Sequence, residues 1–311
     1  MIRLSLSCGA YDRTLPVLTG LVQPEGIELN LPPLDYAVGM GSPDADVYEM
    51  PIATMIIQRA RTDTHRAIAV FPKRTFFHQL LMVRTDSPLH GLEELRGARI
   101  GLMNWYQHAM GVWLRGHLRE RFGIMPEELE WTTERAMSYP LTGPGQPAIK
   151  VIQGEPTLVQ RLEAGEIDLF VHENARRILA EHPSLRRLIP DHKEAETAYY
   201  AATGTVPLNH VLCIRKEIVA RDPWVARSLV DAFTTAKEMA LGAMERNSAV
   251  VSTPWLDSLL EEQRARLARD VFPYGLEPNR PAIERLIRYL HEQALIPDRL
   301  PVDEIFANDV Q

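Results

Sequence analysis

The chain has 311 residues, of which 45% are hydrophobic and 24% charged, a composition typical of a globular protein. Its length favours two lobes of ordinary size over one continuous core. The formal net charge is −7. Together with the lack of any Lys/Arg run, this charge excludes a typical nucleic-acid-binding protein but not the binding of a small anion.

The cysteines and the apolar segments exclude further classes. Cys8 and Cys213 form neither a disulfide framework nor a metal-binding spacing. No apolar run approaches the roughly 18 residues of a membrane span. The first 14 residues lack the apolar core of a secretory signal. We therefore expect a cytoplasmic protein.

Strands and helices alternate in the first 70 residues. The apolar and polar alternation predicts strands at residues 2–7, 26–31, 46–50 and 67–70. Helical segments are expected at residues 15–21 and 51–61, with Pro51 in the first turn of the second segment. Residues 32–44 contain several Pro and Gly residues and are expected to be irregular.

Residues 76–109 form the segment around which the chain is organised. An apolar run at 80–83 predicts a buried strand, and a short helix ending at Gly97 precedes a second strand at 98–102. A polar and aromatic turn, 103–108, then leads into a helix at 109–122. One strand thus leaves a first lobe, and a new strand–turn–helix unit begins a second. The free backbone N–H groups at the start of this helix favour the binding of an anion there.

The remaining chain continues the alternation and then becomes helical. Residues 132–147 are rich in Gly, Pro and Ser and are expected to form a loop over a cleft. Helices are predicted at 156–164, 176–181 and 194–200, and strands at 167–171 and 208–214. Asp222-Pro223 and Thr253-Pro254 are typical helix starts. With a helix at 282–293, they predict a helical C-terminal third.

This order of elements predicts an α/β protein with two lobes, each a mainly parallel sheet flanked by helices. We expect lobe 1 to contain residues 1–84 and 208–311, lobe 2 to contain residues 85–207, and a ligand cleft to lie between them. Ligands of such sheets bind beyond the carboxyl ends of the strands. In this chain those ends are residues 8–13, 48–49, 71–72, 103–107, 171–174 and 209–210.

Several segments of the chain are similar to a known family. Residues 92–102 (LEELRGARIGL) and 162–171 (LEAGEIDLFV), with two crossings between lobes, resemble the type II periplasmic-binding-protein fold. The chain more specifically resembles the 4,5-dihydroxyphthalate decarboxylases, cytoplasmic enzymes on that fold. The segments that carry this resemblance are 8–14 (CGAYDRT), 22–27 (VQPEGI), 46–50 (DVYEM), 71–74 (FPKR) with His78, 112–116 (VWLRG), 189–191 (IPD), 199–210 and 222–226 (DPWVA).

The chain departs from the family pattern at four places in or near the predicted cleft. They are Phe77 in place of Arg, Asn209 in place of Met, a shortened segment before Glu49, and residues 172–174. The resemblance implies a cofactor-independent decarboxylase of a hydroxylated aromatic acid, active in aromatic catabolism, and a homo-oligomer is possible. Two alternatives stay open. One is a binding protein or sensor for a small carboxylate, and the other is a different enzyme on this fold, such as a menaquinone-pathway synthase or dehydratase.

Three residues are candidates for acid–base chemistry. Decarboxylation of an aromatic acid needs a proton delivered to the ring carbon that loses CO₂, and a positioned His, Asp or Glu can supply it. His78, Glu49 and His210 lie at predicted strand ends. Each has a structural alternative, because His78 and His210 could bond to backbone and Glu49 could cap the following helix.

Substrate carboxylates favour arginine, whose planar fork binds them through two hydrogen bonds. Arg13 is the first candidate, with Asp12 orienting it, although the two could also form a surface turn. Arg74 is expected to replace the arginine absent at position 77. His172 and Arg176 are predicted to share a helix face.

The other candidate substrate-binding residues are polar or aromatic side chains near predicted strand ends: Tyr11, Asn104, Tyr106, Gln107 and Asn209. Trp105 or Tyr106 could stack on an aromatic ring, and polar residues at a helix start could instead be caps. We expect no cofactor. A divalent metal held by His172 and Glu173 with His78 and His210 stays open, although these residues lack a tight ligand spacing.

Overall fold

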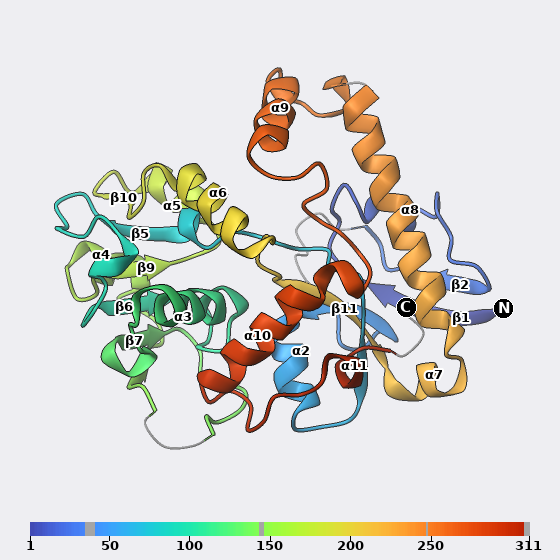
Figure 1. Cartoon of the computed structure of the whole chain (residues 1–311), viewed down its shortest axis with the longest axis horizontal. Coiled ribbons are helices and arrows are strands. Elements are labelled where there is room, and N and C mark those ends of the chain that lie inside the picture. Colours follow the sequence, from blue (N-terminus) through green and yellow to red (C-terminus); the bar gives the residue numbers. More distant parts are fainter. Residues whose placement is uncertain (35–40, 143–145, 247, 308–311) are drawn as a thin grey trace. The chain divides into compact units, whose positions relative to one another are not determined.

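The computed structural model describes residues 1–34, 41–142, 146–246 and 248–307 (Figure 1). Parts of the irregular segment expected at 32–44 and of the loop expected at 132–147 therefore lie outside the described residues. The chain divides into two compact units. Unit 1 contains Met1–Arg74, Leu208–Glu284 and Leu300–Gln311, and unit 2 contains Thr75–Pro207 and Arg285–Arg299.

Unit 1 contains a five-stranded sheet with the order β2-β1-β3-β11-β4. Its strands are β1 (Ile2–Ser7), β2 (Ile27–Asn30), β3 (Val47–Pro51), β4 (His65–Ile68) and β11 (His210–Arg215). β1 pairs in parallel with β2 and β3, and β11 runs antiparallel to both β3 and β4. The sheet is thus mainly parallel, as predicted, with one reversed strand inserted between two parallel ones.

The helices of unit 1 cover this sheet and extend beyond it. They are α1 (Leu15–Leu18), α2 (Ile52–Arg59), α7 (Lys216–Arg221), α8 (Trp224–Arg246), α9 (Leu256–Arg266) and α11 (Val302–Ile305), with the short 3₁₀ helices η4 (Ser248–Val250) and η5 (Glu277–Asn279). α2 packs on β3, β4 and β11 through a buried apolar face. Figure 1 shows α8 and α9 in shades of orange, and η4 lies between them in the sequence.

Unit 2 contains a six-stranded sheet with the order β10-β5-β9-β6-β7-β8. Its strands are β5 (Leu81–Arg84), β6 (Arg99–Leu102), β7 (Glu130–Thr133), β8 (Ile149–Val151), β9 (Leu169–Val171) and β10 (Leu185–Arg187). β6, β7, β8 and β9 are parallel, whereas β5 is antiparallel to β9 and β10. Each unit therefore has a mainly parallel sheet in which the strand next to a chain crossing is reversed.

The helices of unit 2 include the long helix predicted after the central turn. They are α3 (Ala109–Phe122), α4 (Leu158–Glu163), α5 (Ala175–Glu181) and α6 (His192–Thr203), with η1 (His78–Leu80), η2 (Leu92–Glu94) and η3 (Pro126–Glu128). α10 (Arg280–Glu292) contains the division between the two units. α3 ends at Gly123, whose φ of 64° is left-handed, as expected for a glycine that ends a helix.

The structure differs from the sequence prediction at several short elements. β7, β8 and β10 were not predicted, because strands of three or four residues carry little pattern of their own and are held by their neighbours. The first unit boundary lies after Arg74, not after residue 84, because β5 pairs with β9 and β10 of unit 2. No described helix is both long and apolar enough to cross a lipid bilayer.

Candidate functional site

In unit 1 the order of the strands places Glu49 beside two other strand ends. Ser7 at the end of β1 pairs with Tyr48, and Pro51 at the end of β3 pairs with His210 at the start of β11. Glu49 is opposite Leu212, so the side chains of Glu49 and His210 are diagonal neighbours on one face of the antiparallel pair.

Glu49 is fully buried and accepts three hydrogen bonds. Its Oε2 accepts from the backbone N–H of Gly9 at 2.8 Å, and its Oε1 accepts from the Tyr11 hydroxyl at 2.9 Å. His210 Nδ1 donates to the same Oε1 at 2.6 Å. These donors compensate the cost of burying a carboxylate.

The hydrogen bond to Glu49 fixes the orientation of the His210 ring. Because Nδ1–H donates to a carboxylate, Nε2 is the nitrogen that accepts a proton in the neutral imidazole and delivers it again from the imidazolium. Nε2 makes no hydrogen bond with any described residue. Glu49 and His210 thus form a carboxylate–histidine pair suited to general acid–base chemistry.

The loop after β1 completes this cluster through close packing. The Thr14 hydroxyl accepts from the Tyr11 N–H at 2.9 Å and donates to the Gly9 carbonyl at 2.6 Å. A Cβ at Gly9 would lie 2.6 Å from the Tyr11 ring, so this close approach requires glycine. Burial and the charge of Glu49 raise the pKa of Tyr11, so its hydroxyl stays a donor at neutral pH.

Arg13 lies in the same loop, held by its neighbours. Asp12 Oδ1 accepts from Nη1 at 2.8 Å, and the Pro72 carbonyl accepts from both Nε and Nη2. The guanidinium lies 4.6 Å from the centre of the Tyr11 ring and 4.4 Å from that of Phe272. Of the five N–H donors of an arginine, two remain without a described acceptor. Arg13 is therefore oriented by Asp12 and still able to bind an anion.

Arg74 does not resemble Arg13 in its surroundings. It is buried, donates to the Pro273 carbonyl at 2.8 Å and to Asn279 Oδ1, and lies 5.4 Å from the Phe71 ring centre. This guanidinium anchors the segment at 273–279.

Asn209 is held by its backbone and not by its side chain. Its N–H donates to the Lys73 carbonyl at 3.0 Å, and its own carbonyl accepts from Ile52 N–H at 2.8 Å. The side chain is 1% exposed, and neither its oxygen nor its nitrogen has a partner among the described residues. A buried amide of this kind can bind both a donor and an acceptor of a ligand.

In unit 2, His78 lies in a cluster of aromatic rings. It stacks on Phe77 at 4.1 Å and has Tyr199 and His117 at 5.5 and 5.8 Å, measured between ring centres. Its Nδ1 is buried without a described partner. Burial, with smaller contributions from neighbouring histidines, lowers the pKa of His78 to about 3. The ring is thus neutral near pH 7 and, unlike that of His210, has no carboxylate partner.

The turn at 103–108 is fixed by its own polar side chains. Asn104 has a left-handed backbone, with φ of 62°, and its carbonyl accepts from the N–H groups of Glu134 and Arg135 at 3.0 and 2.9 Å. The Gln107 amide donates to the Tyr139 carbonyl at 2.9 Å and accepts from Ser138 N–H at 3.0 Å. Both residues therefore hold the turn against the segment at 134–139.

Tyr106 and His172 take positions that sequence reasoning did not predict. Tyr106 is fully buried, with the Arg115 guanidinium 3.6 Å from its ring centre and Trp131 edge-on at 5.4 Å, so its ring has no free face for a ligand. His172 precedes α5, which begins at Ala175, so the predicted shared helix face with Arg176 is wrong.

Two of the residues considered as metal ligands lie close to the turn. His172 Nδ1 accepts from Asn174 N–H at 2.9 Å, and His108 Nε2 lies 3.4 Å from Glu173 Oε1. Within the described ranges, no three His, Cys, Asp or Glu side chains are grouped so that they could hold a metal ion.

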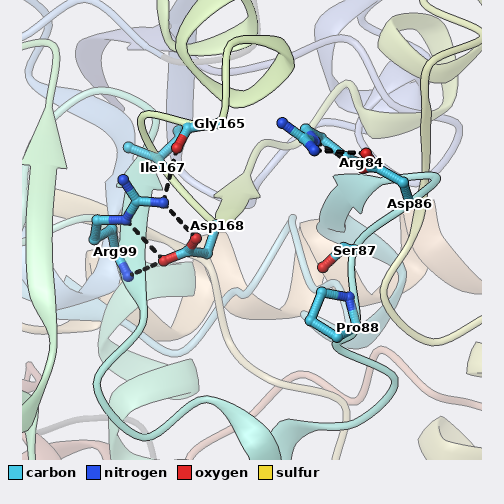
Figure 2. A pocket seen from close by; sticks show the side chains of 8 residues that line it. All are labelled: Arg84, Asp86, Ser87, Pro88, Arg99, Gly165, Ile167 and Asp168. Carbon is cyan, nitrogen blue, oxygen red and sulfur yellow. Dashed lines mark hydrogen bonds and ion pairs between the residues drawn. The ribbon is translucent and has the colours of Figure 1, made fainter.

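A pocket of about 230 Å³ lies in unit 2 at the start of β6 (Figure 2). Figure 2 shows Arg99 bonded to Asp168 and to the Gly165 carbonyl, and Arg84 bonded to Asp86. These ion pairs are partly exposed, and within each pair the two charges neutralise each other. The pocket lies at the amino ends of β6 and β9, the edge opposite the turn at 103–108, so we do not assign it a ligand.

The comparisons with known proteins confirm the resemblance to the decarboxylases. No family model matches the chain. It is 28% identical over 319 residues to 4,5-dihydroxyphthalate decarboxylase of Comamonas testosteroni, covering 98% of this chain and 96% of that protein. It is 27% identical over 213 residues to the Pseudomonas putida protein of the same name, covering 65% of this chain and 82% of that protein.

Solved structures confirm the fold. The aliphatic sulphonate-binding protein SsuA of Escherichia coli is 12% identical with a TM-score of 0.56, covering 98% of this chain and 91% of SsuA. The desulfurization enzyme DSZB is 15% identical with a TM-score of 0.53, covering 100% of this chain and 97% of DSZB. The chain therefore has the two-lobed periplasmic-binding-protein-like fold. A binding protein and an enzyme share this fold, so the fold alone does not decide between binding and catalysis.

Proposed function

We propose that the chain is a carboxy-lyase that decarboxylates a hydroxylated aromatic carboxylic acid, with 4,5-dihydroxyphthalate as the nearest named substrate. The observation that carries the proposal is the buried Glu49–His210 pair in a chain that matches a named decarboxylase over 98% of its length. Such a pair supplies the acid–base group that this reaction needs.

The proposed reaction replaces a carboxylate by a proton on one ring carbon. A ring hydroxyl of the substrate transfers its proton to a base and pushes electron density into the ring. A proton is then delivered to the carbon that bears the leaving carboxylate. The bond to that carboxylate breaks, its electron pair returns to the ring, CO₂ leaves, and the remaining phenolate takes a proton from water. For 4,5-dihydroxyphthalate the product is 3,4-dihydroxybenzoate.

We assign the proton transfers to His210. Its Nε2 is the free ring nitrogen, and Glu49 stabilises the imidazolium that forms when the ring accepts a proton. Arg13 is the proposed anchor of a substrate carboxylate, because Asp12 and Pro72 orient it and two of its N–H groups remain. Asn209 and Tyr11 are further candidates for contact with the substrate. His78 is the alternative acid–base residue in unit 2.

The proposed reaction needs no organic cofactor, because the substrate hydroxyl acts as the electron source. Activity that survives prolonged treatment with EDTA would support a reaction without a divalent metal. Loss of activity that Mn²⁺, Zn²⁺ or Mg²⁺ restores would contradict it.

A cytoplasmic location belongs to the same proposal. Fractionation of cells, with an antibody that detects the chain in each fraction, tests it.

The direct test is incubation of the purified protein with 4,5-dihydroxyphthalate and related phenolic diacids. We expect release of one CO₂ per molecule of substrate, measured by manometry, and the appearance of the monoacid, measured by chromatography. His210→Ala, purified in the same way, is the matched control for contaminating activity. Absence of turnover with every phenolic diacid would refute the proposal.

A binding protein for a small carboxylate is the second candidate, favoured by the fold it shares with SsuA. It has less support, because that match is 12% identical whereas the match to the decarboxylase is 28% identical. Thermal stabilisation by a diacid that is recovered unchanged would favour binding alone.

A further inference from the structure

The segment from residue 270 to residue 279 lies beside Arg13 and is fixed by hydrogen bonds to other parts of unit 1. The buried Lys237 ammonium donates to Asp270 and to the Phe272 carbonyl, the latter at 3.2 Å. Arg74 donates to the Pro273 carbonyl at 2.8 Å, and Gly275 N–H donates to the Ala69 carbonyl at 2.8 Å. This segment places the Phe272 ring on the Arg13 guanidinium.

Asn279 fixes the same segment through hydrogen bonds from its C-terminal end. Its amide nitrogen donates to the carbonyls of Pro273 and Gly275 at 2.9 and 2.7 Å. Tyr274 lies between these two anchored residues, so its backbone is held on both sides. The backbone from which its side chain projects is therefore fixed by the fold.

Tyr274 ends in a hydroxyl that the protein does not use. The residue is 8% exposed, and its hydroxyl is buried with no hydrogen-bond partner among the described residues. A buried hydroxyl without a partner is costly, so its retention calls for an explanation. The charged groups that act on it are Arg13, Arg74 and Asp12, with Lys237 5.1 Å from its ring centre.

The electrostatic surroundings make this hydroxyl a donor to an anion. Burial raises the pKa of Tyr274, so the phenol stays protonated at neutral pH. Arg13, Arg74 and Lys237 contribute positive charge to its surroundings, and Asp12 and Asp270 contribute negative charge, so the positive charge is in excess, which favours an anionic ligand over a cationic one.

We propose that the Tyr274 hydroxyl donates a hydrogen bond to the substrate carboxylate that Arg13 binds, and that this carboxylate is the one retained in the product. The inference rests on the proposed function. A carboxylate held by a guanidinium and a phenol is stabilised as an anion, so it is a poor leaving group and a good anchor. A diacid with neighbouring carboxylates has one group for this anchor and one to lose as CO₂.

Tyr274→Phe tests the inference, because it removes only the hydroxyl. We expect KM for 4,5-dihydroxyphthalate to rise about tenfold or more, the range for a hydrogen bond to a charged group, with kcat nearly unchanged. The product keeps the anchored carboxylate. The Kd of 3,4-dihydroxybenzoate, measured by titration calorimetry, should therefore rise by the same factor.

Tyr106→Phe is the matched control. Its hydroxyl is also buried without a described partner, but it lies in unit 2 among Arg115 and Trp131. We expect KM and Kd of this variant to equal those of the wild type. The Tm of Tyr274→Phe should not fall, because an unsatisfied polar group is lost.

The outcomes separate this inference from the proposed function. Turnover by the wild type, with unchanged KM and Kd in Tyr274→Phe, overturns the inference and leaves the function. If the wild type turns over no phenolic diacid, the function fails, and calorimetry with phthalate still tests the contact. Equal Kd values for phthalate in the two proteins, or no binding by either, would then overturn the inference as well.

Discussion

The two histidines predicted to perform acid–base chemistry lie in contrasting surroundings. His210 in unit 1 donates to a buried carboxylate that Gly9 and Tyr11 also bind. His78 in unit 2 packs against rings, and burial lowers its pKa to about 3. Both precede or begin a strand next to a chain crossing, so their local sequence does not separate them. The difference shows that tertiary partners, and not local sequence, distinguish the surroundings of the two candidate histidines.

The largest expected effect is on the histidine that has a carboxylate partner. We expect His210→Ala to lower kcat by about 10²–10⁴, the contribution of a positioned general acid or base, with a much smaller change in KM. Glu49→Gln should act in the same direction, since an amide no longer stabilises the imidazolium. Steady-state kinetics measure both effects, with Tm as the control for folding. Full activity in both variants would exclude this site.

Arg13→Ala should mainly weaken binding. We expect KM to rise about tenfold to a hundredfold with little change in kcat, as for the loss of charged hydrogen bonds made equally in the ground and transition states. Arg99→Ala is the matched control, because Arg99 is also paired with an aspartate but lies in the surface pocket of unit 2. An equal rise in KM for Arg99→Ala would contradict the assignment to unit 1.

His78→Phe should have a smaller effect on catalysis. Phenylalanine preserves the stacking on Phe77, so we expect kcat to fall by less than about tenfold, well below the loss expected for a general acid or base. The measurement is kcat at saturating substrate beside that of His210→Ala. A loss as large as that of His210→Ala would transfer the proton chemistry to unit 2.

The smallest expected effect is on the pH dependence of stability. His78 has an ordinary pKa of 6.5 and a folded value of about 3, so between these values the unfolded chain binds more protons. Stability is therefore lost as the pH falls through this window. His117, with a folded pKa of about 4 caused by burial, has the same sign. Burial of Glu196 raises its pKa to about 7, which has the opposite sign between pH 4.5 and 7.

The difference in the free energy of unfolding between His78→Phe and the wild type isolates the contribution of His78 from those of the other titrating groups. The free energy of unfolding of His78→Phe, minus that of the wild type, should increase as the pH falls from 6.5 toward 3. Urea denaturation at several pH values measures it. Tyr199→Phe is the control from the same cluster, because burial raises the pKa of Tyr199 and it does not titrate in this range. A difference that stays constant with pH would show that His78 is not held neutral by burial.

Local patterns determined most of the elements and the class of fold. Ile2–Ser7 alternates apolar and polar residues, and α3 begins and ends where its flanking turn and Gly123 predict. The strand ends were also readable from sequence, which is why Glu49, His210 and Arg13 were singled out. Each of these signals depends on a few neighbouring residues, and the strand and helix periods are properties of the local backbone.

Only the tertiary structure decided which polar residues meet. Glu49 and His210 are 161 positions apart, and they touch because β11 inserts beside β3 in a register that puts both on one face. Arg13 and Arg74 were both candidate anion-binding residues, but Arg74 is buried and donates to the Pro273 carbonyl and to Asn279. Tyr274 was not predicted at all, since its segment, which places Phe272 on Arg13, is held by anchors far away in the chain. Such pairings depend on strand order and burial, which no local pattern contains.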